Sequence, residues 1–94
     1  MNQLSVNDLV DIIETRQNAN IRYSFILESK LYEAQLEDIE KTNHEVSLNF
    51  LQGDLKIILN AETVVLNSFK NQYEILSNGE YIGSLTLERE KQRQ

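Results

Sequence analysis

Alternation of apolar and polar residues is the feature that most constrains the fold of this chain. In the segment IRYSFILE, Ile21, Tyr23, Phe25 and Leu27 fall on one side of an extended backbone, because successive side chains in a strand point to opposite faces. The same period of two recurs in EVSLNFL, LKIIL, ETVVLNS and EYIGSLTLE. This period is typical of strands with one buried face. Residues 21–88 are therefore predicted to be rich in β-structure.

The turns between these segments rely on asparagine. The chain has no proline, only three glycines and ten asparagines, and asparagine tolerates the left-handed backbone that tight turns need. Asn78-Gly79, flanked by alternating apolar residues, predicts a two-residue hairpin loop. Gly53-Asp54 predicts a second hairpin turn. Short turns between consecutive strands favour an antiparallel sheet.

One N-terminal segment has the period of a helix instead. Apolar residues recur three, four and seven positions after Val6, and Ser5 with Asp8 three residues later is typical of a helix N-terminus. We expect a helix over residues 5–17, with an apolar stripe that needs a sheet to cover it. The stripe consists of Val6, Leu9, Val10 and Ile13.

The acidic segment LYEAQLEDIEKTNHE, residues 31–45, fits two structures. As a strand it places Tyr32, Ala34 and Leu36 on the inner face, following a turn at Ser29-Lys30. As a helix it uses the strong helix formers Leu, Glu, Ala, Gln and Lys. Its position between two predicted strands favours the strand interpretation, and the helical interpretation remains as an alternative. In both structures a row of carboxylates faces solvent.

Together these patterns predict one α+β domain over residues 1–94. The expected fold is an N-terminal helix packed on an antiparallel sheet of five to six strands, with curling toward a small barrel left open. The length suits a single domain, since these typically span about 50 to 200 residues. Residues 89–94, which alternate in charge and lack apolar side chains, are expected to be a frayed tail.

Enzymatic and metal chemistry have little support in the sequence. There is no cysteine, and His44, the one histidine, falls in a predicted turn. Metal sites usually combine several histidines, cysteines or ordered acids, and nucleophilic catalysis needs an activated side chain. We expect no enzyme activity, no cofactor and no bound metal.

The net charge of -6 narrows the choice of partners. Because nucleic acids and anionic membranes bind mainly through cations, this charge disfavours both and permits a basic protein. An acidic stretch is also commonly a solvated face, and a tyrosine commonly packs at the edge of a core. The candidate partner-binding residues are Glu33, Glu37, Asp38, Glu40, Glu45 and Tyr32.

The composition also carries a resemblance of class. A short, acidic chain without cysteine or proline, rich in Asn, Lys, Ile and Glu, resembles accessory proteins of phages and mobile elements, among them anti-CRISPR and anti-restriction inhibitors. This resemblance implies a protein that occludes a basic nucleic-acid-processing enzyme. The alternative is a structural or assembly subunit, and homodimerisation through a sheet edge stays open. The N-terminus, which lacks the basic start of a signal peptide, leads us to expect a cytoplasmic location.

Overall fold

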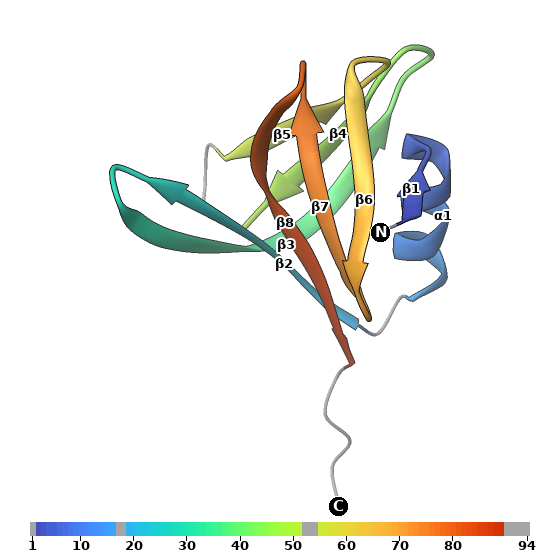
Figure 1. Cartoon of the computed structure of the whole chain (residues 1–94). Coiled ribbons are helices and arrows are strands. Elements are labelled where there is room, and N and C mark those ends of the chain that lie inside the picture. Colours follow the sequence, from blue (N-terminus) through green and yellow to red (C-terminus); the bar gives the residue numbers. More distant parts are fainter. Residues whose placement is uncertain (1, 17–18, 52–54, 90–94) are drawn as a thin grey trace, which may run out of the picture.

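The computed structural model describes residues 2–16, 19–51 and 55–89 (Figure 1). One helix and eight strands make up this part of the chain. In chain order they are β1 (Asn2–Leu4), α1 (Val6–Thr15), β2 (Ala19–Leu27), β3 (Lys30–Lys41), β4 (Val46–Phe50), β5 (Lys56–Leu59), β6 (Thr63–Phe69), β7 (Gln72–Ser77) and β8 (Glu80–Arg89).

All eight strands belong to one antiparallel sheet with the order β1-β6-β7-β8-β2-β3-β4-β5. The sheet joins two runs of sequential neighbours, β2 to β5 and β6 to β8, through pairing of β2 with β8. The α+β class and the antiparallel sheet are confirmed. The predicted count of five to six strands is wrong, partly because β1 has only three residues, too few to show a pattern.

The sheet curls strongly but does not close into a barrel. Figure 1 shows β6, β7 and β8 standing in front of β3, β4 and β5, with α1 beside β6. Closure would require the two outermost strands to pair, and β1 and β5 remain separate edges of the sheet. The barrel alternative is therefore excluded.

The helix begins where its cap was expected. The Ser5 side chain accepts a hydrogen bond from the Asp8 backbone amide, and the Asp8 carboxylate accepts one from the Ser5 amide, which completes a capping box. The helix ends at Thr15, two residues before the predicted end. Leu9, Val10 and Ile13 of the predicted stripe are buried.

The core lies between the helix and the concave face of the sheet. It draws on both runs of strands, and burial of such side chains contributes roughly 25 cal/mol per Å² of apolar surface. The side chains with 1% exposure or less are Leu9, Leu48, Leu59, Val65, Ile75, Leu85 and Leu87.

Residues 30–41 form a strand, so the helical alternative is excluded. The turn before β3 uses Glu28 and Ser29, one residue earlier than predicted, because Leu27 pairs with Lys30. The Asn78-Gly79 turn is confirmed, with φ angles of 53° and 80°. The predicted turn at Gly53-Asp54 and the tail residues 90–94 lie outside the described residues.

Candidate functional site

The hairpin of β2 and β3 extends beyond the rest of the sheet, and its tip, residues 25–32, is called the arm here (Figure 1). Strand β8 pairs with β2 only from Ala19 to Ser24, and β4 pairs with β3 only from Leu36 onward. The two strands of the arm therefore pair with each other and with no further strand among the described residues. The arm is a two-stranded ribbon attached to a larger sheet.

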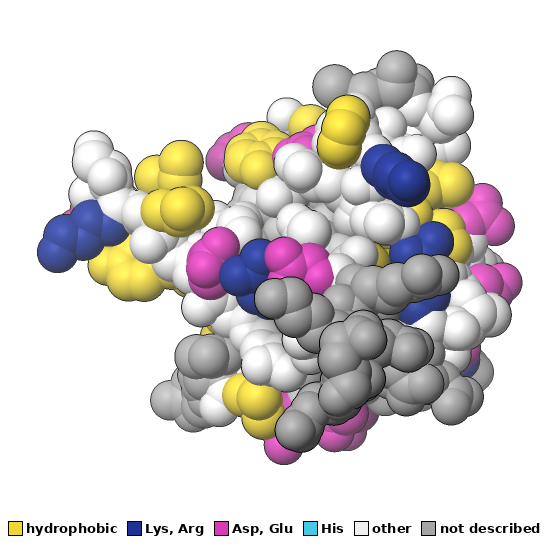
Figure 2. Space-filling view, turned by 90° about the horizontal axis from the view of Figure 1, so that it is seen from below, with side chains coloured by type: hydrophobic (Ala, Val, Ile, Leu, Met, Phe, Trp, Pro, Cys, Tyr) yellow, Lys and Arg dark blue, Asp and Glu magenta, His cyan; other side chains and the backbone are white. Residues whose placement is uncertain are grey.

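Apolar side chains occupy both faces of the arm. Ile26 and Leu31 are cross-strand partners on the outer face, and they are 69% and 66% exposed. On the inner face Leu27 is 57% exposed and Tyr32 is 41% exposed. Figure 2 shows hydrophobic side chains gathered on this projecting part, at the left of the view. Soluble proteins seldom leave several neighbouring large apolar side chains uncovered, and such patches often mark interaction sites.

A ladder of aromatic rings connects the arm to the core. Phe50, Tyr23, Phe25 and Tyr32 stack in sequence with ring centroids 5.5, 5.3 and 5.5 Å apart. The first two rings are buried, whereas Tyr32 is at the exposed end. Stacking of aromatic pairs contributes about 0.5 to 1.5 kcal/mol beyond their burial. The ladder holds the base of the arm, and it places the predicted partner-binding residue Tyr32 on the inner face.

The Tyr23 hydroxyl is fixed as well. It donates a hydrogen bond to the carbonyl of Ile82. Burial raises the pKa of Tyr23 to about 12, with a smaller contribution from Tyr81. Burial also raises the pKa of Tyr81. The phenol at the base of the ladder is therefore held neutral over the physiological range.

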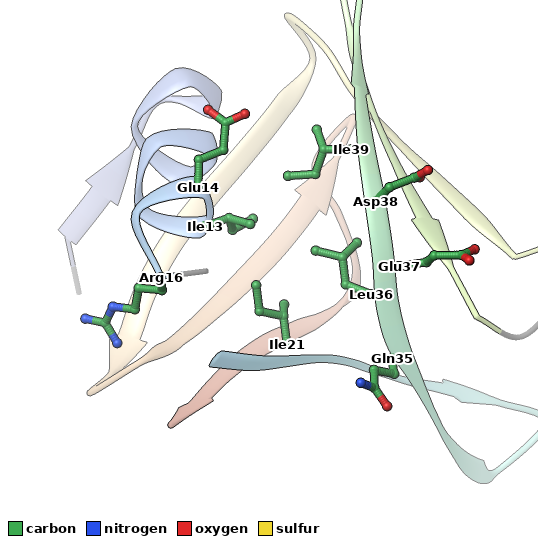
Figure 3. Close-up of a pocket in the computed structure, with 9 residues that line it drawn as sticks. All are labelled: Ile13, Glu14, Arg16, Ile21, Gln35, Leu36, Glu37, Asp38 and Ile39. Carbon is green, nitrogen blue, oxygen red and sulfur yellow. The ribbon is translucent and has the colours of Figure 1, made fainter. Parts of the chain in front are cut away.

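Four predicted acids share the outer face of β3, and we call Glu33, Glu37, Asp38 and Glu40 the acidic ridge. A bulge between Leu36 and Asp38 inserts Glu37 as an extra residue. In Figure 3, Glu37 and Asp38 both point away from Leu36 and Ile39. By simple alternation Glu33 and Glu37 face outward, whereas Asp38 and Glu40 would face inward. The bulge turns Asp38 and Glu40 to the outer face as well.

The ridge is poorly neutralised at its centre. Glu33 contacts Arg22 at 3.6 Å, and Arg22 also binds Glu88 at 2.5 Å. Among the described residues, no cation lies within 4.0 Å of the carboxylates of Glu37, Asp38 or Glu40.

A neutral amide holds the centre of the ridge instead. The side-chain nitrogen of Asn49 donates to Asp38 at 2.7 Å and to Glu40 at 3.0 Å. The Asn49 oxygen accepts in turn from the Ser47 hydroxyl at 3.0 Å. These bonds fix the two carboxylates without cancelling their charge, so the ridge is an ordered negative surface.

Glu45 lies outside β3. It follows the turn between β3 and β4, where its backbone carbonyl accepts from the Thr42 amide at 2.9 Å. His44 in the same turn is exposed. The structure thus brings four of the five predicted acids onto one face of β3, and it places Glu45 in the connection that follows this strand.

An open groove of about 580 Å³ lies between α1 and β3. Figure 3 shows Ile13, Ile21, Leu36 and Ile39 pointing into it from the helix and the strands. At its rim Glu14 forms an ion pair with Lys41 at 2.9 Å.

The described residues that line the groove do not place a catalytic acid and base face to face. The other rim cation, Arg16, donates to the side-chain oxygen of Asn71 at 2.6 Å, while Glu37 and Asp38 point away. An aliphatic interior with paired charges at its rim offers no acid and base facing one another. Within the described ranges, no three His, Cys, Asp or Glu side chains are placed to hold a metal ion.

The exposed pair Ile26 and Leu31 was not predicted as part of a site. Both are apolar residues at positions that alternation assigns to the polar face, one on each side of a predicted turn. This exception to the alternation could have identified the pair from the sequence alone. The role of Asn49 in the ridge could not be predicted, because its contacts depend on the register of β3 with β4.

Comparison with known proteins found no matching family, no similar curated protein and no similar solved structure. In the part of the chain that the structure describes, no helix has the length and apolar character needed to cross a membrane. The arm and the acidic ridge are therefore the features from which a function can be inferred.

Proposed function

We propose that this chain is a non-enzymatic protein-binding module whose arm and acidic ridge together contact a basic partner protein. The observation that carries this proposal is the arm, where large apolar side chains on a projecting hairpin stay exposed. A hairpin that leaves the body cannot cover the chain's own core, so its apolar side chains gain burial only against another molecule.

The ridge supplies the preference for a basic surface. It begins where the arm ends and continues along the same strand, so one partner can contact both. Three of its carboxylates have no cation within ion-pair distance among the described residues. Opposite charges across an interface accelerate association and select the partner, and apolar anchors supply much of the affinity.

Within this function, we favour an inhibitor that occludes the nucleic-acid site of an enzyme. Such a site has a cationic lining that normally contacts a row of phosphates. Along an extended strand, Glu33 and Glu37 are about 13 Å apart at ~3.3 Å per residue, with further acids beyond them. A row of fixed carboxylates offers such a lining the charge that phosphates would offer.

The proposal is tested with two variants that each lose three negative charges, one in the ridge and one elsewhere on the surface. The ridge variant Glu37→Gln/Asp38→Asn/Glu40→Gln loses three charges from β3 and keeps oxygen acceptors for Asn49. The control variant Asp11→Asn/Glu62→Gln/Glu80→Gln loses three charges from exposed residues elsewhere. Each protein is used to capture partners from a lysate at about 50 mM and about 200 mM salt, because charge pairing weakens with salt.

The wild-type and control proteins should retain the same basic protein at low salt, and the ridge variant should bind it tens-fold more weakly. Thermal stability should be similar in all three, because exposed charges contribute about 0 to 1 kcal/mol to folding. If the ridge and control variants captured the partner equally well, the ridge would not be part of the interface. Capture of acidic or neutral proteins alone would contradict the proposed partner class.

A further inference from the structure

The arm half of β3 has one edge that no described strand covers. Leu27 and Lys30 flank a two-residue loop, and residues in that position exchange hydrogen bonds with each other. Because backbone groups alternate sides along a strand, the amides and carbonyls of Leu31 and Glu33 face away from β2. The next group on that side, the Gln35 carbonyl, accepts from the Leu51 amide at 2.9 Å. The free edge thus spans residues 31–33.

We propose that the partner binds by adding an extended segment to this edge as one further strand. This inference rests on the proposed function and specifies how the partner is bound. Exposed sheet edges are templates for strand addition, in which main-chain hydrogen bonds give affinity and side chains give specificity. The added segment would run antiparallel to β3 and would bond the four outward-facing backbone groups of Leu31 and Glu33, which have no partner strand among the described residues.

Side chains beside the edge define the chemistry of that segment. On the outer face, a residue of the added segment opposite Leu31 would also contact Ile26 and should be apolar. The residue opposite Glu33 should be basic. On the inner face, Tyr32 calls for an apolar or β-branched residue. The segment therefore carries one basic residue followed by two apolar residues.

Charge disfavours a second copy of this chain as the occupant. Self-pairing about Tyr32 would set Leu31 of each copy beside Glu33 of the other, so each exposed leucine would meet a carboxylate. It would also bring together two chains that each carry a net charge of -6. A cationic segment meets the carboxylates of Glu33 and Glu37 with opposite charge. The same arm and ridge are complementary to a basic strand.

The probe is a synthetic seven-residue peptide with a Lys-Val-Val centre flanked by threonine and lysine. Its control is the same peptide methylated at every second backbone amide, which keeps charge and side chains but blocks the hydrogen bonds to the edge. We expect the unmethylated peptide to bind at least tenfold more tightly in fluorescence anisotropy. We also expect it to slow amide hydrogen exchange at Leu31 and Glu33.

A variant pair tests the edge from the side of the protein. Leu31→Pro and Leu31→Ala both lose the leucine side chain, and only proline removes the amide that faces the edge. That amide has no partner strand in the described chain, so proline is tolerated there. Leu31→Pro should bind the unmethylated peptide about five- to tenfold more weakly than Leu31→Ala.

The outcomes separate this inference from the proposed function. If the ridge variant weakens peptide binding while Leu31→Pro equals Leu31→Ala, the acidic surface stands and strand addition is wrong. If neither change matters, or if no peptide binds at about 1 mM, both are wrong. Protection of the Leu31 and Glu33 amides without peptide, together with a dimer in sedimentation, would overturn the inference in favour of a second copy. Co-sedimentation with phosphatidylcholine vesicles that Leu31→Ala abolishes would overturn it in favour of a bilayer.

Discussion

Gly83 is the position where adding one methyl group should damage the fold most clearly. A Cβ built at Gly83 would lie 2.5 Å from Cε1 and Cζ of Tyr23 and 2.6 Å from the carbonyl oxygen of Ser24. Carbon atoms in contact are normally about 3.5 to 4.0 Å apart, so the ring would have to move by about 1 Å. Gly83 also has φ of +153°, which residues with a side chain rarely adopt.

The Tyr23 ring has no space into which it can retreat. It is 4% exposed, it stacks on Phe25 and Phe50, and its hydroxyl is bonded to the Ile82 carbonyl. Overpacking a core costs about 1 to 3 kcal/mol and a strained backbone costs a similar amount. Gly83→Ala should therefore lower the free energy of unfolding by about 3 to 5 kcal/mol. For a domain of this size that corresponds to a fall in Tm of roughly 12 to 40 °C.

Gly79→Ala is the matched control. Gly79 also has a positive φ, +80°, but a Cβ there meets nothing within 4 Å. It should cost only the backbone strain, about 1 to 2 kcal/mol. Urea and thermal denaturation followed by circular dichroism would measure both variants. The reasoning is refuted if Gly83→Ala costs no more than Gly79→Ala, or if Tyr23→Leu fails to recover part of the loss in the double variant.

Three further predictions concern local features. The arm turn has Glu28 and Ser29 at φ of 52° and 67°, a left-handed backbone that asparagine and glycine adopt more easily. The variant Glu28→Asn/Ser29→Gly should therefore be about 1 to 2 kcal/mol more stable in urea denaturation. Unchanged stability would argue against this turn geometry. Burial favours the neutral Tyr23 phenol, so its stabilising effect is complete below pH 10 and is lost as pH rises toward its folded pKa of about 12. Wild type should lose about 3 kcal/mol more than Tyr23→Phe over that interval, and parallel losses would contradict the assignment. Ser5→Ala should cost about 1 kcal/mol and Ser5→Asp almost nothing, since only the alanine removes the cap; equal thermal shifts would count against the capping box.

Local patterns predicted the elements of this fold better than their arrangement. Ser5 with Asp8 located the helix start, and Asn78-Gly79 located a hairpin, because both depend on residues close together in sequence. The number of strands was underestimated in part because β1 forms only by pairing with β6, for example Gln3 with Leu66. A three-residue strand has no period of its own to detect.

The candidate site was predictable only in part for the same physical reason. The acids of β3 could be found by their density, and simple alternation already puts Glu33 and Glu37 together on the outer face. The bulge at Glu37, which turns Asp38 and Glu40 outward, arises from the register with β4 and leaves no mark in the sequence. The exposure of Ile26 and Leu31 follows from where β8 and β4 stop pairing, which also depends on contacts distant in sequence.

The pairing of β2 with β8 has a consequence for how the chain acquires its structure. Residues such as Ser24 and Ser84 become neighbours although most of the chain separates them, whereas β6, β7 and β8 can pair successively through short turns. Contacts between distant residues close large loops and slow the folding rate. During synthesis β2 emerges from the ribosome long before its β8 partner, so its second edge stays uncovered while translation continues. Among the described strands, β8 comes last along the chain, and it joins the two runs of strands. A nascent chain arrested before residue 84 would therefore leave one edge of β2 without its β8 partner.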